Sequence, residues 1–432
     1  MSIGLMALIV LIGLIILIAS GLELFVAYGL MAFVGITLLM TKSPLQLAST
    51  AFLQSNSYLM TAVPAFIFMG TILSQTKAVQ QLFDAAQKWI GFLPGGVACA
   101  IVVGNAVFGA MCGSSIAAVA TFGKVSYPSL ERLGYKPGLA LGTIAIAGSL
   151  STTIPPSISL IVYGSFAGVS VPRLFAAALL PGIILALLFI VTIIIRVLIN
   201  PQNAPAAVKS SWKDKILSLK NLIPWILLIA IVLGTTFAGI LTPTESAAIG
   251  ALGSLILAIV YRQISWKGVK EACLSAAKLT SMLIFILITV AALSQAFRYI
   301  GVIDVVSNFF LSLEGGKLAF LIILYIFYLL AGMFVDDLSP LLLTVPFVMP
   351  VLRDLGLSPV WFGVWYLSVE SIAMISPPFG FNLFVLHSVV PKHPVMTIAK
   401  GALPFIVPCL AVSVLVALLP QLALWLPNLL YG

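Results

Sequence analysis

Pro128-Ser-Leu-Glu-Arg-Leu-Gly-Tyr-Lys-Pro137 recurs 222 positions later as Pro350-Val-Leu-Arg-Asp-Leu-Gly-Leu-Ser-Pro359, with both prolines, two leucines and the glycine in register. The same offset places Pro155-Pro156 on Pro377-Pro378. Six of the eleven prolines before residue 210 fall on another proline at this offset. The overall proline content predicts roughly 0.6 such coincidences, so the chain is predicted to contain two copies of one unit.

Composition places the chain in a lipid bilayer. Hydrophobic residues make up 62% and charged residues 8% of its 432 positions, whereas soluble domains are about a quarter charged. Apolar runs long enough to cross a bilayer, about 17–25 residues, include Phe25–Thr41, Leu174–Ile199, Leu222–Ile240 and Leu403–Leu426. The predicted class is an all-α polytopic membrane protein.

The basic residues indicate how the two copies are oriented. The formal net charge is +9, but lysines and arginines lie in loops between apolar runs, which is typical of an orientation signal and not of a nucleic-acid site. The loop Arg262–Lys278 has four basic residues, whereas its counterpart Met40–Asn56 has only Lys42. Because cytoplasmic loops gather Lys and Arg, the copies are predicted to have inverted topology.

Two inverted repeats joined by a basic connector follow from this orientation. Residues 1–200 form the first repeat, with a re-entrant hairpin at 97–123 and a broken helix at 138–170. Residues 201–221, which overlap the basic stretch from Arg196 to Lys220, form a cytoplasmic connector. Residues 222–432 form the second repeat, with a hairpin at 317–345 and a broken helix at 360–390. Both termini are then outside, and inverted repeats with broken helices are typical of transporters.

The breaks in the helices carry polar groups. Consecutive prolines lack amide donors and open the helix, leaving carbonyl oxygens free in the membrane, where each costs several kcal/mol unless it is occupied. A bound cation is a natural occupant, joined by side-chain oxygens of Ser114, Ser115, Ser151, Thr152, Asp337 and Ser376. The alternative is a plain proline kink with back-bonded hydroxyls. Matched breaks and polar hairpin turns in both copies favour a site.

Half-helices that begin at the breaks suit an anionic substrate. The positive dipole ends after Ser115, Ser157 and Gly380 favour a carboxylate. Asn382, Thr152 and Ser157 add polar contacts in this interpretation.

Acidic residues within apolar stretches need an explanation, because each costs about 2.5–3.5 kcal/mol at the bilayer centre. Asp336 either caps the helix that begins near Leu338 or binds a cation, and Asp337 is the better ligand candidate. Glu370 either neighbours the cation site or pairs with a basic residue. Glu23 and Glu245 are expected to cap helix starts.

Several functional classes have little support. Two histidines offer little material for a proton relay, and no protease constellation is present, so an enzyme is not expected. The four cysteines are scattered singly, so they are interpreted as packing residues and no cofactor is expected. The expected function is sodium-driven uptake of a small anionic solute. Two alternatives stay open, namely a passive anion channel and a sodium-coupled exporter with the same inverted design.

The motifs resemble the large membrane subunit of tripartite ATP-independent periplasmic (TRAP) transporters along essentially the whole chain. They include Leu93-Pro-Gly-Gly96, Gly113-Ser-Ser115, Arg132-Leu-Gly-Tyr135, Pro155-Pro-Ser157, Leu241-Thr-Pro-Thr-Glu245 and Pro377-Pro-Phe-Gly-Phe-Asn-Leu383. The resemblance implies an elevator-type, sodium-coupled transporter in the bacterial inner membrane. Its expected partners are a small membrane subunit on a separate chain and a soluble periplasmic binding protein that delivers C4-dicarboxylates, sialic acid or other organic acids.

The resemblance also implies the sodium ligands. They lie at hairpin tips and unwound Pro-Pro stretches, here around Gly113, Ser114, Ser115, Gly148, Ser151 and Pro155, and around Gly332, Asp337, Ser376 and Pro377. Members of the family often have Thr before and Val after the second Pro-Pro pair, where this chain has Ser376 and Phe379. The sequence does not identify the solute.

Overall fold

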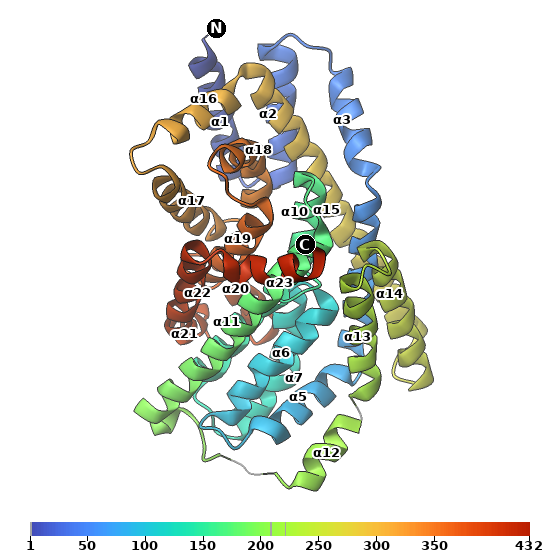
Figure 1. Ribbon diagram of the computed structural model, residues 1–432. Coiled ribbons are helices and arrows are strands. Elements are labelled where there is room, and N and C mark those ends of the chain that lie inside the picture. The colour runs from blue at the N-terminus through green and yellow to red at the C-terminus, as the bar shows by residue number, and fades with distance from the viewer. Residues whose placement is uncertain (1, 208–209, 221) are drawn as a thin grey trace.

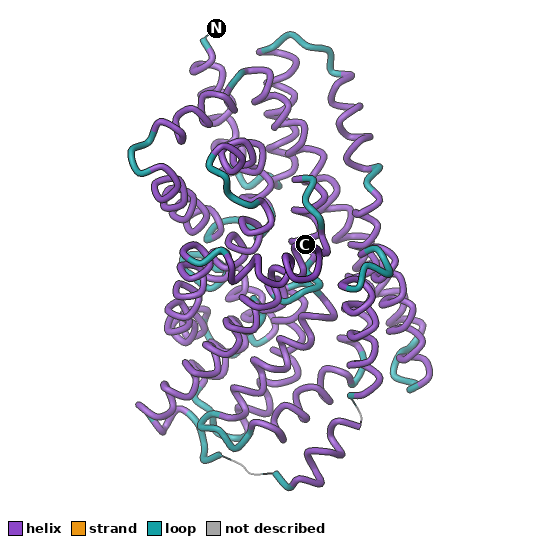
Figure 2. Tube along the Cα trace, viewed as in Figure 1, coloured by secondary structure: helices purple, strands orange, loops and turns teal. Residues whose placement is uncertain are grey.

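The regular structure is helical throughout residues 2–207, 210–220 and 222–432, which the computed structural model describes (Figure 2). The all-α prediction is confirmed for these residues. Lys209 of the predicted connector lies outside them. Up to the connector the helices are α1 (Ile3–Ala19), α2 (Leu24–Phe33), a π-helical turn (Val34–Leu39), α3 (Leu45–Ser55), α4 (Ala62–Gln75), α5 (Ala78–Ile90), α6 (Gly96–Cys112), α7 (Ser115–Arg132), α8 (Pro137–Ala147), α9 (Leu150–Thr153), α10 (Ile158–Ala167) and α11 (Val171–Ile199).

After the connector the chain is again almost continuously helical. The helices are α12 (Trp212–Lys220), α13 (Ile223–Phe237), α14 (Pro243–Val260), α15 (Trp266–Ile300), α16 (Val302–Ser312), α17 (Gly316–Gly332), α18 (Ser339–Asp354), α19 (Pro359–Ala373), α20 (Phe381–Val389), α21 (Val395–Ala402), α22 (Ile406–Leu418) and α23 (Gln421–Tyr431). Short 3-10 turns lie at Tyr58–Thr61, Pro201–Asn203 and Leu403–Phe405.

Six helical segments of the described chain are long and apolar enough to cross a membrane, or seven if the bent α12–α13 pair counts as one span. The six are Tyr58–Gln75, Pro137–Ala167, Val171–Ile199, Pro243–Val260, Trp266–Ile300 and Val395–Leu418. The polytopic prediction is therefore confirmed. The bounds predicted for the last span, Leu403–Leu426, are wrong, because α22 ends at Leu418 and Pro420 precedes α23. The apolar sequence continues past Pro420, but the helix ends before it.

The helices form two groups. The peripheral bundle comprises α1–α4 and α13–α15, in which α15 packs along α2, α3 and α4, and α16 connects this bundle to α17 and α18. The central bundle comprises α5–α11 and α17–α23, in which α8 packs on α21 and α11 packs on α19, α22 and α23. Figure 1 shows the N-terminus and α12 at opposite ends of the molecule. The division into two inverted repeats stays a prediction.

Small residues and stacked aromatics position the central bundle. A Cβ built at Gly142 of α8 would lie 2.2 Å from the carbonyl carbon of Gly401 in α21, so only glycine permits this crossing. The buried rings of Trp361 and Trp365 stack at 6.1 Å within α19. Tyr328 of α17 meets Tyr366 of α19 edge-on at 4.7 Å, which fixes these two helices against each other.

Helix ends follow local sequence chemistry. Thr242 and Glu245 form a reciprocal capping box at the start of α14, which confirms the capping role of Glu245. Glu23 stands at the N-cap of α2, but its side chain makes no capping hydrogen bond, so its predicted role is wrong. Helices α9 and α10 are separated by Pro155-Pro156, and α19 and α20 by Pro377-Pro378, as the missing amide donors require.

Candidate functional site

The turn between α6 and α7 forms the first hairpin tip. Gly113 adopts a left-handed conformation with φ of 59°, and its carbonyl accepts a hydrogen bond from the Ile158 amide at 3.3 Å. A Cβ at Gly113 would lie 2.8 Å from the Pro156 carbonyl oxygen, so glycine is required by both conformation and space. Ser114 accepts from the Ala117 amide and caps α7. The tip therefore docks on the break between α9 and α10.

Asn382 connects this tip to both broken helices. Its side chain is fully buried near the start of α20, and its Oδ1 accepts a hydrogen bond from the Ser115 hydroxyl at 2.8 Å. Its amide nitrogen donates to the carbonyl of Ala145 in α8 at 3.0 Å. One side chain thus joins α7, α8 and α20.

The turn between α17 and α18 forms the second hairpin tip. Oδ2 of Asp336 accepts from the amides of Leu338 at 3.2 Å and Ser339 at 3.3 Å, so the capping alternative for Asp336 is confirmed. Asp337 instead accepts a hydrogen bond from the Ser159 hydroxyl of α10 at 2.7 Å. The Tyr366 hydroxyl donates to the Asp337 carbonyl at 2.6 Å.

Glu370 lies beside the second tip. Its side chain is 1% exposed and accepts from the Tyr366 hydroxyl at 3.2 Å, so Tyr366 links it to Asp337. A Cβ at Gly332 would lie 2.7 Å from its Oε2. Within the described residues no Lys or Arg nitrogen lies within 4.0 Å of Glu370, because the one ion pair found there joins Lys392 and Glu131. Pairing of Glu370 with a basic residue is therefore wrong, and it neighbours the predicted cation ligands.

The central cavity, of about 100 Å³, lies where the two tips meet the peripheral bundle. It is lined by six of the predicted site residues, namely Gly113, Ser114, Ser115, Thr152, Asp337 and Asn382. Apolar side chains of α4 and α15 close its other side, including Ile67, Met282 and Leu283. Pockets for small molecules are typically 300–1,000 Å³. In this conformation the cavity accommodates an ion or a few waters, and a larger solute requires it to open.

The remaining predicted residues lie around this cavity without lining it. Oγ of Ser151 is buried and has no hydrogen-bond partner among the described residues. Gly148 packs against Ser115, where a Cβ would lie 3.4 Å from the hydroxyl. Ser157 caps α10. The Ser376 hydroxyl is bonded to its own helix through the Ile372 carbonyl at 2.7 Å.

Three further predicted residues belong to the breaks. Pro155 lies in the first break, and Pro377 in the second is exposed. Gly380 adopts a left-handed conformation as the N-cap of α20. Sequence reasoning missed Ser159 and Tyr366. Ser159 could have been found, because it is a second hydroxyl residue two positions after Ser157 in an apolar half-helix. No feature of the sequence distinguishes Tyr366.

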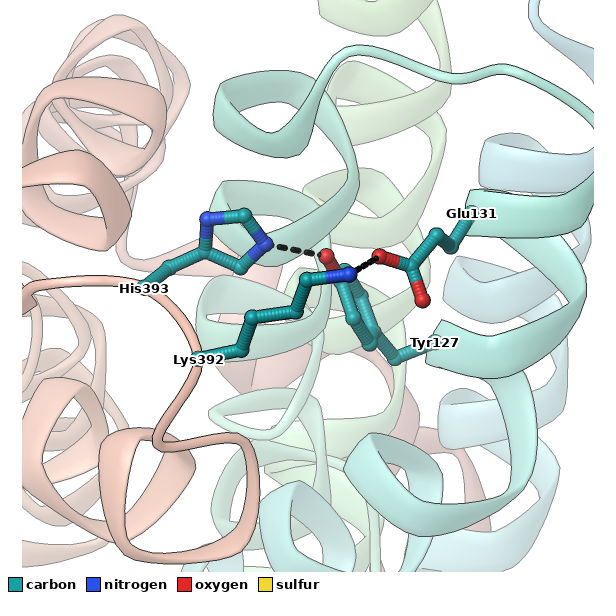
Figure 3. Close-up of polar contacts among 4 residues, drawn as sticks. All are labelled: Tyr127, Glu131, Lys392 and His393. Carbon is teal, nitrogen blue, oxygen red and sulfur yellow. Dashed lines mark hydrogen bonds and ion pairs between the residues drawn. The ribbon is translucent and has the colours of Figure 1, made fainter.

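A polar cluster joins α7 to the segment after α20, away from the cavity (Figure 3). The Tyr127 hydroxyl lies within hydrogen-bond distance of Nε2 of His393. Lys392 donates to Glu131 at the exposed last turn of α7, and this hydrogen bond holds the pKa of the Glu131 carboxyl below its ordinary value. The cluster ties the first hairpin to the second broken helix at their far ends.

Comparison with known proteins gives the class of this helical membrane protein. The family described as the tripartite ATP-independent periplasmic transporter, DctM component, matches residues 11–422, and the chain belongs to this family. It is therefore the large membrane subunit of a TRAP transporter, which is a transporter component and not an enzyme.

Relatives cover nearly the whole chain. It is 32% identical to the C4-dicarboxylate TRAP transporter large permease protein DctM of Vibrio cholerae, over 92% of each chain. It is 30% identical to the ectoine/5-hydroxyectoine large permease UehC of Ruegeria pomeroyi, over 86% of each chain. It is 28% identical to the sialic acid large permease SiaM of Vibrio cholerae, over 87% of this chain and 88% of that protein.

Solved structures share the fold at low identity. The YdaH transporter of Alcanivorax borkumensis superposes with a TM-score of 0.62 at 15% identity, over 88% of each chain. MtrF of Neisseria gonorrhoeae superposes with a TM-score of 0.57 at 12% identity, over 86% of this chain and 84% of that chain.

Proposed function

We propose that this subunit imports a small organic acid by sodium-coupled symport through an elevator mechanism. The acid is delivered by a soluble periplasmic binding protein, and the subunit works in the bacterial inner membrane with a separate small membrane subunit. The class of solute follows its relatives, which are named for C4-dicarboxylates, sialic acid and ectoine.

The observation that carries the proposal is that two carboxyl groups at the central cavity lack a basic partner. Asp337 lines the cavity and Glu370 is buried next to it, with no Lys or Arg within 4.0 Å of either in the described chain. Carboxylates in a membrane interior require a counter-charge or a partner. A sodium ion supplies the counter-charge and accepts carboxylate, carbonyl and hydroxyl oxygens as ligands.

Two sets of sodium ligands are proposed, one at each tip. At the first tip they are Gly113, Ser114, Ser115, Gly148, Ser151 and Pro155, and the buried, unpartnered Oγ of Ser151 supports this set. At the second tip they are Gly332, Asp337, Ser376 and Pro377, where the contact between Ser159 and Asp337 supports a polar site. Each set lies within one copy of the sequence.

The substrate carboxylate is proposed to bind at the starts of α7 and α20. Ser115 and Asn382 hold these starts together, and the positive dipole ends of the two helices attract an anion. The contributing residues are Ser115, Thr152, Ser157, Gly380 and Asn382. Because the central cavity has walls from both bundles, motion of the central bundle along the peripheral one would open it and carry the site across the membrane.

Uptake into proteoliposomes tests the proposal. The large and small subunits are reconstituted with the binding protein of the same system, and uptake of radiolabelled succinate, N-acetylneuraminate and ectoine is followed. We expect concentrative uptake of one acid that requires both the binding protein and an inward sodium gradient. Undiminished uptake in potassium buffer would overturn sodium coupling. Conductance without the binding protein would favour an anion channel.

A further inference from the structure

A second cavity, of about 730 Å³, lies apart from the central one. Helices α3 and α15 form one wall, and α10, α16 and α18 form the other. Its volume falls within the 300–1,000 Å³ that is typical of small-molecule sites, whereas the central cavity is too small for an organic acid in this conformation. We call it the arginine cavity.

Two arginines line this cavity. Arg298 stands in the last turn of α15 and Arg353 in the last turn of α18, and both are exposed. Within the described residues neither guanidinium has a carboxylate within 4.0 Å or a hydrogen-bond acceptor. Asp304 is the acidic residue of the lining, so the cavity keeps an excess of positive charge.

The wall of the cavity beside Arg298 is polar and ordered. Gln295 accepts a hydrogen bond from Thr50 at 2.7 Å and donates to the Tyr299 hydroxyl at 3.1 Å, which holds these side chains in place between α3 and α15. Arginine presents a planar fork of donors that matches a carboxylate. A lipid chain is a poor occupant, because charged guanidinium groups are costly against hydrocarbon.

We propose that the arginine cavity binds the carboxylate of a small organic acid through Arg298 and Arg353. This role rests on the proposed function, since the acid bound here is the transported one on its way from the binding protein. The orientation predicted from loop charge places the end of α18 outside. Helix α18 also begins at the second tip, and its sixteen residues span roughly 24 Å, so it leads from the arginine cavity to the central one.

Direct binding without sodium tests the proposal separately from transport. The full-length subunit, co-purified with its small subunit in detergent, is titrated by calorimetry in potassium buffer at constant ionic strength. The probes are succinate, N-acetylneuraminate and ectoine, with succinamide as the uncharged match for succinate. The variants are Arg298→Gln and Arg353→Gln, with Arg132→Gln as the control, because Arg132 is also an exposed arginine in the last turn of a helix but lies outside the cavity.

We expect at least one of the acids to bind, with a Kd that rises about tenfold or more in each cavity variant and is unchanged in Arg132→Gln. Arg298→Lys should retain only part of the affinity, since lysine keeps the positive charge but lacks the planar pair of donors that binds a carboxylate. The proposal is overturned if no acid binds, if succinamide binds as well as succinate, or if both glutamine variants bind like the wild type. Failure of sodium coupling in the uptake assay would leave these results unaffected.

Discussion

The hydroxyl of Ser159 donates a hydrogen bond to Oδ2 of Asp337 at 2.7 Å, across 178 residues of sequence. A matching bond runs from Ser115 to Asn382 at 2.8 Å. Ser115 and Asp337 are 222 positions apart, which is the offset of the sequence repeat. Each hairpin tip is therefore bonded to the half-helix that follows the Pro-Pro break of the other copy. Two copies related by a pseudo-two-fold axis would make such a reciprocal pair of contacts.

Asp337→Asn tests the role of this carboxylate in sodium binding. Asparagine keeps the size and an acceptor for Ser159 but removes the charge, so a cation at the second tip would lose its charged ligand. We expect the half-saturating sodium concentration for uptake to rise about tenfold or more. Asp84→Asn is the control, because Asp84 is exposed on α5 and bonded only to Gln80. Wild-type sodium dependence of Asp337→Asn would remove Asp337 from the site.

A double-mutant cycle between Ser115 and Asn382 tests the other tip. Interhelical hydrogen bonds in membrane proteins average about 0.6 kcal/mol, and we expect a coupling energy near this value. Reversible unfolding of the reconstituted protein in denaturing detergent measures it. Ser115→Ala should in addition weaken sodium dependence of uptake. Ser388→Ala, on the exposed side of α20, is expected to show no coupling to Asn382→Ala.

Local chemistry made the breaks predictable from sequence, and tertiary contacts decided the rest. Pro155-Pro156 and Pro377-Pro378 interrupt helices wherever they stand, and Asp336 accepts hydrogen bonds from amides at the start of the helix that follows it. The hydrogen-bond partner of Asp337 could not be predicted from the sequence. The 222-residue offset relates each residue to its equivalent in the other copy, and not to the residue that it contacts there. Arg298 and Arg353 reach one cavity from helix ends 55 positions apart, which no pattern in the sequence indicates.

Gly70→Ala tests whether the two bundles move against each other. Gly70 lies on α4 of the peripheral bundle, and a Cβ there would lie 2.5 Å from Cβ of Cys112 at the first hairpin tip. An alanine therefore disfavours the observed arrangement of the bundles. We expect alkylation of Cys112, which is buried, to become several-fold faster in the variant, as followed by mass spectrometry.

Two comparisons make this result specific. Cys273 is exposed and reports the general reactivity of the sample. Gly234→Ala in α13, where a Cβ meets nothing within 4 Å, should leave Cys112 as protected as in the wild type. Equal protection of Cys112 in Gly70→Ala would argue against an elevator motion at this contact.

The ion pair between Glu131 and Lys392 predicts an acid-dependent loss of stability (Figure 3). Lys392 lowers the pKa of Glu131 in the folded state, so the pair stabilises the fold above the ordinary Glu pKa of about 4.3. The contribution is lost as the pH falls through the lowered folded-state pKa. We expect Glu131→Gln to melt slightly below the wild type at pH 7, and this difference to shrink as the pH falls below the ordinary Glu pKa. Glu271→Gln is the control, because Glu271 is also exposed. The difference between its melting temperature and that of the wild type should not shrink as the pH falls.

Gly332→Ala tests how Glu370 is positioned beside the second tip. The new methyl group would lie 2.7 Å from Oε2 of Glu370 and 2.8 Å from Cβ of Ala373, so α17 and α19 must separate or Glu370 must turn away from Tyr366. We expect a loss of about 1–3 kcal/mol in unfolding free energy and weaker sodium dependence of uptake.

The double variant Gly332→Ala with Ala373→Gly separates packing from charge placement. It moves one methyl group from α19 to α17, which relieves the contact between the helices but leaves the overlap with the Glu370 carboxylate. Stability should then recover in part, while sodium dependence should stay weak. Recovery of both would mean that Glu370 tolerates displacement and that the glycine serves close helix packing alone. Gly234→Ala, with open space around it, fixes the baseline for an added methyl group in a helix.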